Sequence, residues 1–300
     1  LPVSGVPPVL AEGQGGLGDI VPAPDFDTSR DVYLSWAEAG DGDLAGAAVG
    51  RARLVIGGTS ARLEALQVVW RQEPKVTGRG QYGHRLAFSP DGSYLFVSSG
   101  ERQHFTPAQD LNQNLGKILR LLPDGSAAPG NPFADRGRIP AQIWSLGHRN
   151  PLGLAFDSDG RLWETEMGPK GGDELNLILP GRNYGWPLAS NGSNYDGTDI
   201  PDHRPGDGFE PPKVWWNPSI SPGSLMIYSG DTFPGWRGSA FIGALSGQAL
   251  IRVALDGESA TKADQWNLGA RIRAVVQDPD GSIWLAEDGA GAHLLHLTPA

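Results

Sequence analysis

The sequence predicts an all-β fold, with a β-propeller as its architecture, from three observations. The chain has 43 Gly and 25 Pro among 300 residues, nearly a quarter of its length, with no collagen-like period. Long helices are disfavoured, because helix interiors exclude Pro and a Gly there costs roughly 1 kcal/mol relative to Ala. Short strand–turn–strand patterns recur at intervals of tens of residues, which is typical of propeller blades.

The clearest repeat is a hairpin pattern around an Asp-Gly pair. It occurs in Arg85–Gly100, Leu154–Gly168 and Ala274–Gly289, where apolar residues alternate on both sides of the turn. Asp-Gly is a strong hairpin signal, because Gly tolerates the positive φ that tight primed turns require. We therefore expect an antiparallel strand pair in each of the three segments.

A second repeated element is a short strand that precedes a turn or the chain end. It occurs in Gly116–Gly125, Gly247–Gly257 and Ala292–Pro299. With four strands in a blade of about 45–50 residues, a chain of this length holds about six blades. No change of composition marks a boundary, so we expect one domain over residues 1–300. A β-sandwich or jelly roll with coincidental Asp-Gly turns is the alternative.

Composition and charge exclude several classes of protein. With 39% hydrophobic and 19% charged residues the chain is typical of a folded, water-soluble protein, and it contains no apolar run long enough to span a membrane. The net charge of −10 disfavours binding to nucleic acid or to an anionic membrane surface. The absence of Cys excludes disulfides, thiolate metal sites and a catalytic thiol.

An acidic pair lies among turns between residues 166 and 176. Asp173 and Glu174 follow the Gly168-Pro169 and Gly171-Gly172 turns, whose backbone carbonyls are free of strand pairing in this prediction. Carboxylates and carbonyls are the hard oxygen ligands that calcium prefers, although the spacing is not that of an EF-hand. A solvated acidic turn is the alternative, and composition alone slightly favours it.

Three arginines form a second group of interest. Arg271 and Arg273 share one face of a predicted strand because side chains alternate along it, and Arg149 lies in the loop sequence GHRNPLG. Guanidinium groups in such a cluster suit a ligand that carries several carboxylates. Ion pairing at the protein surface explains the same residues equally well.

The chain resembles the soluble aldose sugar dehydrogenases that use pyrroloquinoline quinone, the glucose/sorbosone dehydrogenase family. The motifs that carry the resemblance span essentially the whole chain, in the order GQGGLGD, AQDL, LGKILRL, IWSLGHRNPLGLAF, MGPKGGDELNLI, GRNYGWP, FPGWRGSAFIGAL and RIRAV. The resemblance implies a six-bladed propeller that binds calcium. It also implies oxidation of an aldose at its anomeric carbon, in the periplasm or outside the cell.

The family's functional residues transfer to matching positions in this chain. The resemblance implies quinone contacts from Gln14, Arg149, Asn150, Ser219, Arg271 and Arg273. It implies a calcium ion on the quinone, held by main-chain oxygens of Gly168 and Pro169. A second, structural calcium is expected on Asp173, Glu174 and Tyr184.

The catalytic position departs from the family pattern. In the family a His removes the sugar's hydroxyl proton while an Arg, here Arg149, stabilises charge on the reduced cofactor. This chain has Gln81 at the position of that His. An amide has no proton-accepting pKa near neutrality, and losing a general base typically costs about 10²–10⁴ in rate.

His84 is the candidate for a displaced base. Three residues along a strand reverse the side-chain face and move about 10 Å, so only a distorted loop would bring His84 to the position of Gln81. The alternative is a histidine at a hairpin edge that faces solvent or a neighbouring blade.

Two further departures concern the cofactor and the amino end. Ser246 stands where some members of the family place a cofactor-binding Lys. Relatives carry about one further blade's worth of strands before the GQGG segment. We therefore expect the first blade to be incomplete in this chain, and the chain to be less stable than one extended upstream.

Two functional hypotheses follow from the sequence. The first is a quinone- and calcium-dependent aldose dehydrogenase, slowed by Gln81; the second is a propeller that binds calcium, quinone or sugar without turnover. A calcium-dependent propeller hydrolase ranks third, because no residue pattern pairs a metal-bound water with a base. The expected partners are an aldose and an electron acceptor that the sequence does not identify, with no nucleic acid and no membrane. We expect a monomer or weak homo-oligomer in the periplasm or outside the cell, with no signal peptide in this chain.

Overall fold

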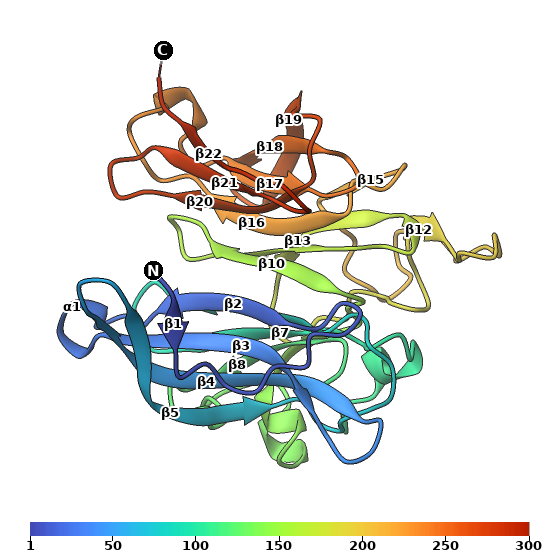
Figure 1. Cartoon of the computed structure of the whole chain (residues 1–300). Helices are drawn as coiled ribbons and strands as arrows, with labels where there is room; N and C mark the ends of the chain where they lie inside the picture. Colours follow the sequence, from blue (N-terminus) through green and yellow to red (C-terminus); the bar gives the residue numbers. More distant parts are fainter. Residues whose placement is uncertain (300) are drawn as a thin grey trace. The chain divides into compact units, whose positions relative to one another are not determined.

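Strands dominate the computed structural model, which describes residues 1–299 (Figure 1). The helical segments have at most four residues each: α1 (Phe26–Ser29) and the 3₁₀ turns η1 (Thr106–Gln109), η2 (Ala134–Arg136), η3 (Pro140–Gln142) and η4 (Pro234–Trp236). The all-β prediction is confirmed. No helix in this part of the chain is long and apolar enough to cross a membrane.

The chain divides into two compact units. The first comprises residues 1–150 with 180–183, and the second comprises residues 151–179 with the chain from Tyr184 onward. Each unit has its own sheets. A single domain over the whole chain stays a prediction.

The first unit contains two sheets. One has the order β1-β5-β4-β3-β2, in which β1 pairs in parallel with β5 and the other pairs are antiparallel; the other is antiparallel, with the order β6-β7-β8-β9. Their bounds are β1 (Val3–Ser4), β2 (Leu17–Pro22), β3 (Asp31–Ala39), β4 (Ala45–Ile56), β5 (Ala61–Arg71), β6 (Gly83–Phe88), β7 (Leu95–Ser99), β8 (Lys117–Leu121) and β9 (Ile143–Leu146). One apolar core, which includes Tyr33, Trp70, Leu86 and Leu119, draws on both sheets.

The second unit contains three antiparallel sheets and a two-stranded ribbon. The sheet orders are β10-β11-β13-β15, β16-β17-β18-β19 and β20-β21-β22, and β12 pairs with β14 in the ribbon. Their bounds are β10 (Pro151–Phe156), β11 (Leu162–Glu166), β12 (Lys170–Gly171), β13 (Asp173–Ile178), β14 (Gly192–Ser193), β15 (Val214–Trp216), β16 (Pro222–Ile227), β17 (Ala240–Ala244), β18 (Ala249–Asp256), β19 (Ser259–Asn267), β20 (Ile272–Gln277), β21 (Ile283–Glu287) and β22 (Leu294–Leu297).

All three predicted hairpins form, as β6–β7, β10–β11 and β20–β21. Their turns differ from the expected tight primed turns. Gly92, Gly160 and Gly281 have the predicted positive φ, but each N–H donates to the carbonyl three residues earlier, within a longer loop. The positive φ is what requires Gly after Asp there. The second repeated element is also confirmed, because its three copies supply β8, β18 and β22.

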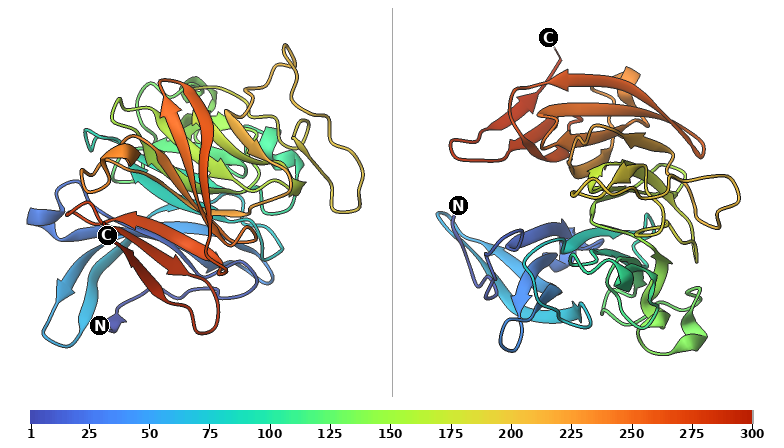
Figure 2. Two further views of the ribbon diagram at one scale, coloured as in Figure 1. Left: turned by 90° about the horizontal axis from the view of Figure 1, so that it is seen from above. Right: turned by 90° about the vertical axis from the view of Figure 1, so that its right-hand side faces the viewer.

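The described residues contain five sheets of three or more strands. Small antiparallel sheets of this size are the units of a propeller, so the propeller prediction is supported, and a sixth blade stays a prediction. Within the second unit, the segment between β14 and β15 reaches away from the strands (Figure 2).

Candidate functional site

Gln81 lies in the loop before β6 and is buried. Its φ of 51° is in the left-handed region, which is uncommon for a residue with a side chain. Its backbone N–H donates to Oε1 of Gln14 at 2.7 Å. The structure therefore brings together two residues that the sequence placed in the site for separate reasons.

The side-chain amide of Gln81 links a carboxylate to a guanidinium. In the orientation that satisfies both neighbours, its nitrogen donates to Oε1 of Glu101 and its oxygen accepts from Nη2 of Arg149 at 2.8 Å. Burial raises the pKa of Glu101, and this outweighs the N–H of Phe105 and the charge of Arg149, which lower it. Glu101, Gln81 and Arg149 thus form one buried polar chain.

The backbone reinforces this chain of side chains. The N–H of Glu101 donates to the carbonyl of Arg149 at 2.9 Å, so the end of β7 is tied to the loop after β9. Asn150, the next residue, is buried, and its Oδ1 has no hydrogen-bond partner among residues 1–299. A buried acceptor without a donor is costly, and a bound ligand would remove that cost.

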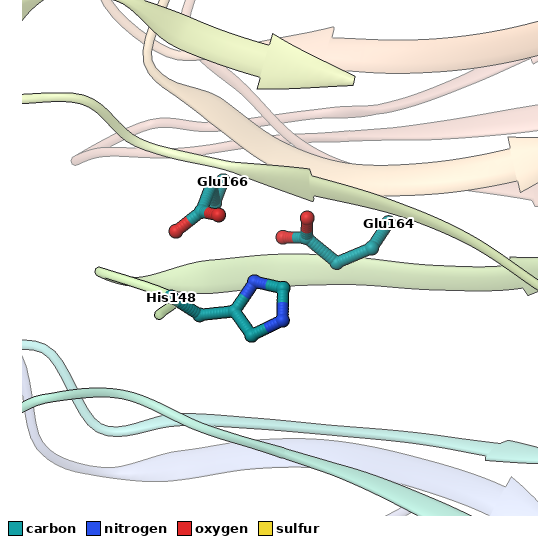
Figure 3. A group of neighbouring side chains, drawn as sticks. All are labelled: His148, Glu164 and Glu166. Carbon is teal, nitrogen blue, oxygen red and sulfur yellow. The ribbon is translucent and has the colours of Figure 1, made fainter. Parts of the chain in front are cut away.

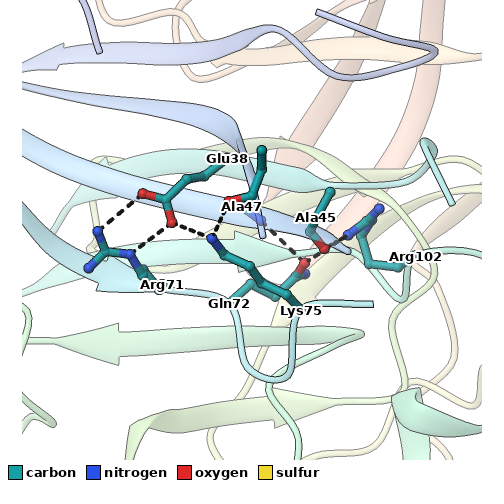
Figure 4. A network of polar contacts seen from close by, with 8 residues as sticks. Glu38, Ala45, Ala47, Arg71, Gln72, Lys75 and Arg102 are labelled. Carbon is teal, nitrogen blue, oxygen red and sulfur yellow. Dashed lines mark hydrogen bonds and ion pairs between the residues drawn. The ribbon is translucent and has the colours of Figure 1, made fainter. Parts of the chain in front are cut away.

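A buried arginine fixes the loop that carries Gln81. Arg102 donates to the carbonyls of Gly78 (2.7 Å), Gly80 (2.8 Å) and Ala45 (2.7 Å), and its guanidinium lies 3.8 Å from the centre of the Tyr82 ring. Figure 4 shows Arg102 at one end of a polar network that includes Gln72 and Ala47. The same view contains the ion pairs of Glu38 with Arg71 and Lys75.

His84 is buried and faces a different neighbour from Gln81. Its Nδ1 lies 3.1 Å from Oγ of Ser35, and its carbonyl accepts from the same hydroxyl at 2.6 Å. A Cβ on Gly18 would lie 1.7 Å from Nδ1, so the ring packs directly on that glycine. Burial, followed by the charges of Arg85 and Arg102, lowers the pKa of His84 to about 3. A histidine with that pKa is a weak base at neutral pH.

Asp173, on β13, binds two loops of the second unit and is completely buried. Its carboxylate accepts from the N–H of Gly168 (2.9 Å) and from Ser219 Oγ (2.6 Å), and from the N–H groups of Ile220 and Ser221 (2.7 Å each). Glu174 is also buried, so the alternative of a solvated acidic turn is wrong. Ser219, an expected quinone contact, is bound to Asp173.

The expected structural calcium set is not gathered by its side chains. Asp173 and Glu174 are neighbours on β13, so their side chains point to opposite faces. The hydroxyl of Tyr184 donates to the carbonyl of Leu177 (2.6 Å) and accepts from the N–H of Leu179 (2.8 Å), which ties it to the end of β13. The donor set of Asp173 is already filled. Calcium on Gly168 and Pro169 stays a prediction.

Arg271 and Arg273 share one face, as predicted, and both bind Asp288. Each guanidinium lies 2.9 Å from Oδ2 of that carboxylate. Burial raises the pKa of Asp288, but the bonds to both arginines outweigh burial and hold this pKa below its usual value. The two side chains are 46% and 40% exposed, and a guanidinium has five N–H groups, so donors remain for an anionic ligand.

Sequence reasoning missed Glu101 in the site. Its only local signal is the position after Gly100, at the end of a predicted hairpin. Its contacts with Gln81 and Arg149 join segments that lie 20 and 48 residues away in the sequence, which no short motif contains.

The fold and the site together define an all-β, propeller-like protein whose polar site residues lie on strands and in the loops between them. A family model described as Glucose / Sorbosone dehydrogenase matches residues 1–296. The chain belongs to the glucose/sorbosone dehydrogenase family.

Two curated relatives illustrate the similarity. The chain is 41% identical over 304 residues to "Aldose sugar dehydrogenase YliI" of Escherichia coli (strain K12), covering 99% of this chain and 81% of the relative. It is 27% identical over 363 residues to "Quinoprotein glucose dehydrogenase B" of Acinetobacter calcoaceticus, covering 94% and 74%.

Two solved structures have the same fold over almost the whole chain. The apo form of the soluble aldose sugar dehydrogenase from Escherichia coli matches with a TM-score of 0.93 and 40% identity, covering 100% of this chain and 87% of that one. The PQQ-bound form of the aldose sugar dehydrogenase from Streptomyces coelicolor matches with a TM-score of 0.79 and 32% identity, covering 98% and 82%.

Proposed function

We propose that this protein is a quinoprotein that oxidises an aldose sugar at its anomeric carbon, with pyrroloquinoline quinone and calcium as cofactors. The observation that carries the proposal is the network in which hydrogen bonds join Gln14 to Gln81, and Gln81 to Arg149. Gln14 and Arg149 lie in two separate family motifs, and Gln81 stands at the position of the family's base His. The relatives named as aldose sugar dehydrogenases, and the PQQ-bound structure among them, support the same function.

The donor set of this chain fits a cofactor that carries three carboxylates. Arg149, Arg271 and Arg273 would neutralise the carboxylates, and Gln14, Asn150 and Ser219 would supply further polar contacts. Calcium would bind main-chain oxygens of Gly168 and Pro169, with a structural calcium involving Glu174. When bound, the quinone accepts the hydride of the sugar and calcium polarises the quinone oxygen.

Gln81 orients its neighbours in this proposal and does not act as a base. Its amide oxygen is used by Arg149 and its nitrogen by Glu101, so it fixes the guanidinium that stabilises negative charge. An amide takes up no proton at neutral pH. We therefore propose turnover that is slow compared with a chain that has a His at this position.

The second candidate function is a propeller that binds quinone, calcium or sugar without catalysis. It is favoured by the same position, because Gln81 is no base and the pKa of His84 is about 3. Both candidate functions include the same further proposals. These are a periplasmic or secreted location, six blades in one domain, and a monomeric or weakly associating state.

A steady-state assay distinguishes the two candidates. The natural chain and Gln81→His are reconstituted with pyrroloquinoline quinone and Ca²⁺ and assayed on several aldoses with an electron-accepting dye. We expect measurable activity in the natural chain and a kcat higher by about 10²–10⁴ in Gln81→His. If only Gln81→His is active, the natural chain is a binding protein without turnover. If the two chains are equally active, the base is a residue other than position 81. If neither chain binds the quinone, the proposal is wrong.

A further inference from the structure

Three buried glutamates and one asparagine line the same side of β11 and β13. Glu164 and Glu166 are two residues apart on β11, and Glu174 and Asn176 are two residues apart on β13, so each pair shares a face. The strand register places Glu164 opposite Asn176 and Glu166 opposite Glu174. The four residues are between 0% and 6% exposed.

Figure 3 shows the side chains of Glu164 and Glu166. It also draws His148, which belongs to the first unit, where its Nε2 lies 2.8 Å from Oγ of Ser145.

The amide of Asn176 faces all three carboxylates. Its Nδ2 lies 3.0 Å from Glu164 Oε2, 3.1 Å from Glu174 Oε2 and 3.4 Å from Glu166 Oε1. An amide nitrogen carries two hydrogens, so it cannot donate fully to three acceptors. Oδ1 of Asn176 and Oε1 of Glu164 are buried and have no hydrogen-bond partner in the described part of the chain.

The charges of this cluster are not balanced by the amide. Three buried carboxylates that lie around the neutral amide of Asn176 repel one another in a medium of low dielectric constant. Either protons or a cation must offset their charge.

His203 is an independent observation at the same place. Its side chain is 4% exposed, and its Nε2 lies 3.9 Å from Oε1 of Glu174. Neither ring nitrogen has a hydrogen-bond partner among residues 1–299. The other ring nitrogen, Nδ1, lies 3.8 Å from Oδ2 of Asp207, which is beyond hydrogen-bond distance. A buried polar side chain therefore stands beside the cluster with neither ring nitrogen in a hydrogen bond.

We propose that Glu164, Glu166 and Glu174 bind a divalent metal cation, with the amide oxygen of Asn176 as a further ligand. Rotating the amide by 180° exchanges its nitrogen and oxygen, which turns the unpartnered Oδ1 toward the carboxylates. Carboxylate and amide oxygens are hard ligands, so Ca²⁺ is the expected ion and Mg²⁺ the competitor. This ligand set shares only Glu174 with the structural calcium expected from the family resemblance.

The test is calorimetric titration of the quinone-free protein with Ca²⁺ after removal of metals with EDTA. Glu164→Gln keeps the shape of the side chain and removes one charge. Glu38→Gln is the control, because Glu38 is a glutamate of the other unit that pairs with Arg71 and Lys75. We expect Glu164→Gln to weaken Ca²⁺ binding by at least about tenfold, since affinity follows the number of charged ligands, and Glu38→Gln to bind as the natural chain does.

Thermal unfolding gives a second readout. Ca²⁺ should raise the melting temperature of the natural chain and of Glu38→Gln, and should have little effect on that of Glu164→Gln. Unchanged Ca²⁺ affinity in a folded Glu164→Gln would overturn the proposal. The calcium would then be assigned to the set expected from the family resemblance, Asp173, Glu174 and Tyr184. A natural chain that binds no Ca²⁺, with a higher melting temperature for Glu164→Gln in EDTA, would show that shared protons stabilise the cluster instead.

Discussion

At the scale of single residues, Glu101 is the hydrogen-bond partner that a histidine at position 81 would have. Its Oε1 accepts from the amide of Gln81, so a histidine in place of Gln81 would find a buried carboxylate within hydrogen-bond reach. A carboxylate in that place orients an imidazole and stabilises its protonated form.

We predict that the activity gained in Gln81→His depends on Glu101. In the double variant Gln81→His/Glu101→Gln, the imidazole loses its charged partner, and kcat should fall at least about tenfold relative to Gln81→His alone. Quinone affinity, measured by absorbance titration, serves as the control for an intact site. A double variant as active as Gln81→His would show that Glu101 has no role in orienting the base.

Lys117 is a second residue whose surroundings lead to a measurable effect. It is completely buried and donates to the carbonyls of Pro107 (2.7 Å), Ala108 (3.0 Å) and Leu115 (2.7 Å). Burial lowers its pKa from 10.5 to about 7, and the charge of Asp110 offsets this only in part. Between those two pKa values the unfolded chain binds more protons than the folded chain at this position.

We predict that Lys117 makes the protein more stable as the pH rises from 7 toward 10. The cost of burying the charged amine is fully present below pH 7 and is lost as the pH approaches the pKa of the unfolded chain. Urea unfolding at pH 7 and pH 9 should show a larger gain in the natural chain than in Lys117→Met, which has no titrating group there. Parallel pH profiles of the two proteins would refute this assignment.

At the scale of strands and loops, Asp173 connects β13 to the loop before β16. Oδ2 accepts three donors and Oδ1 accepts one. In Asp173→Asn the amide nitrogen takes the place of either Oδ1 or Oδ2. In both cases this donor would face at least one backbone N–H, which is also a donor. We predict a loss of about 3 kcal/mol in the free energy of unfolding, because a buried donor is left unpaired. Asp196→Asn, in an exposed turn, is the control, and equal stability of both variants would contradict this role.

The sequence predicted the strands well because their signals are local. The Asp-Gly pairs and the alternating apolar residues lie within single hairpins, and all three hairpins form. The turns were less predictable: Gly92 has the expected positive φ in a longer loop than a primed turn. Alternation also correctly placed Arg271 and Arg273 on one face, but not their shared partner Asp288, which lies 15 residues beyond Arg273.

The carboxylate cluster shows why part of the site was missed. Glu164 and Glu166 in LWETE, and Glu174 and Asn176 in DELN, alternate in a way that places each pair on one face. That signal was readable from the sequence. The register that brings the two pairs together was not, because it depends on the lengths of the intervening turn and of β12. His203 approaches Glu174 from a loop without regular structure, and no pattern predicts that contact.

At the scale of the whole molecule, the chain is acidic, with a net charge of −10. An anionic quinone would therefore need local positive charge, and we propose that Arg149, Arg271 and Arg273 supply it. The chain belongs to the glucose/sorbosone dehydrogenase family over residues 1–296, and the central claim is that it binds pyrroloquinoline quinone and reduces it with an aldose.

A single-turnover experiment tests that claim most directly. The natural chain is loaded with pyrroloquinoline quinone and Ca²⁺, freed of excess cofactor and mixed with an aldose without any electron acceptor, while the absorbance of the bound quinone is followed. We predict that the quinone stays bound, is reduced by the sugar, and is reduced faster in Gln81→His. A quinone that is lost on removal of excess cofactor, or that no aldose reduces in either chain, would contradict it.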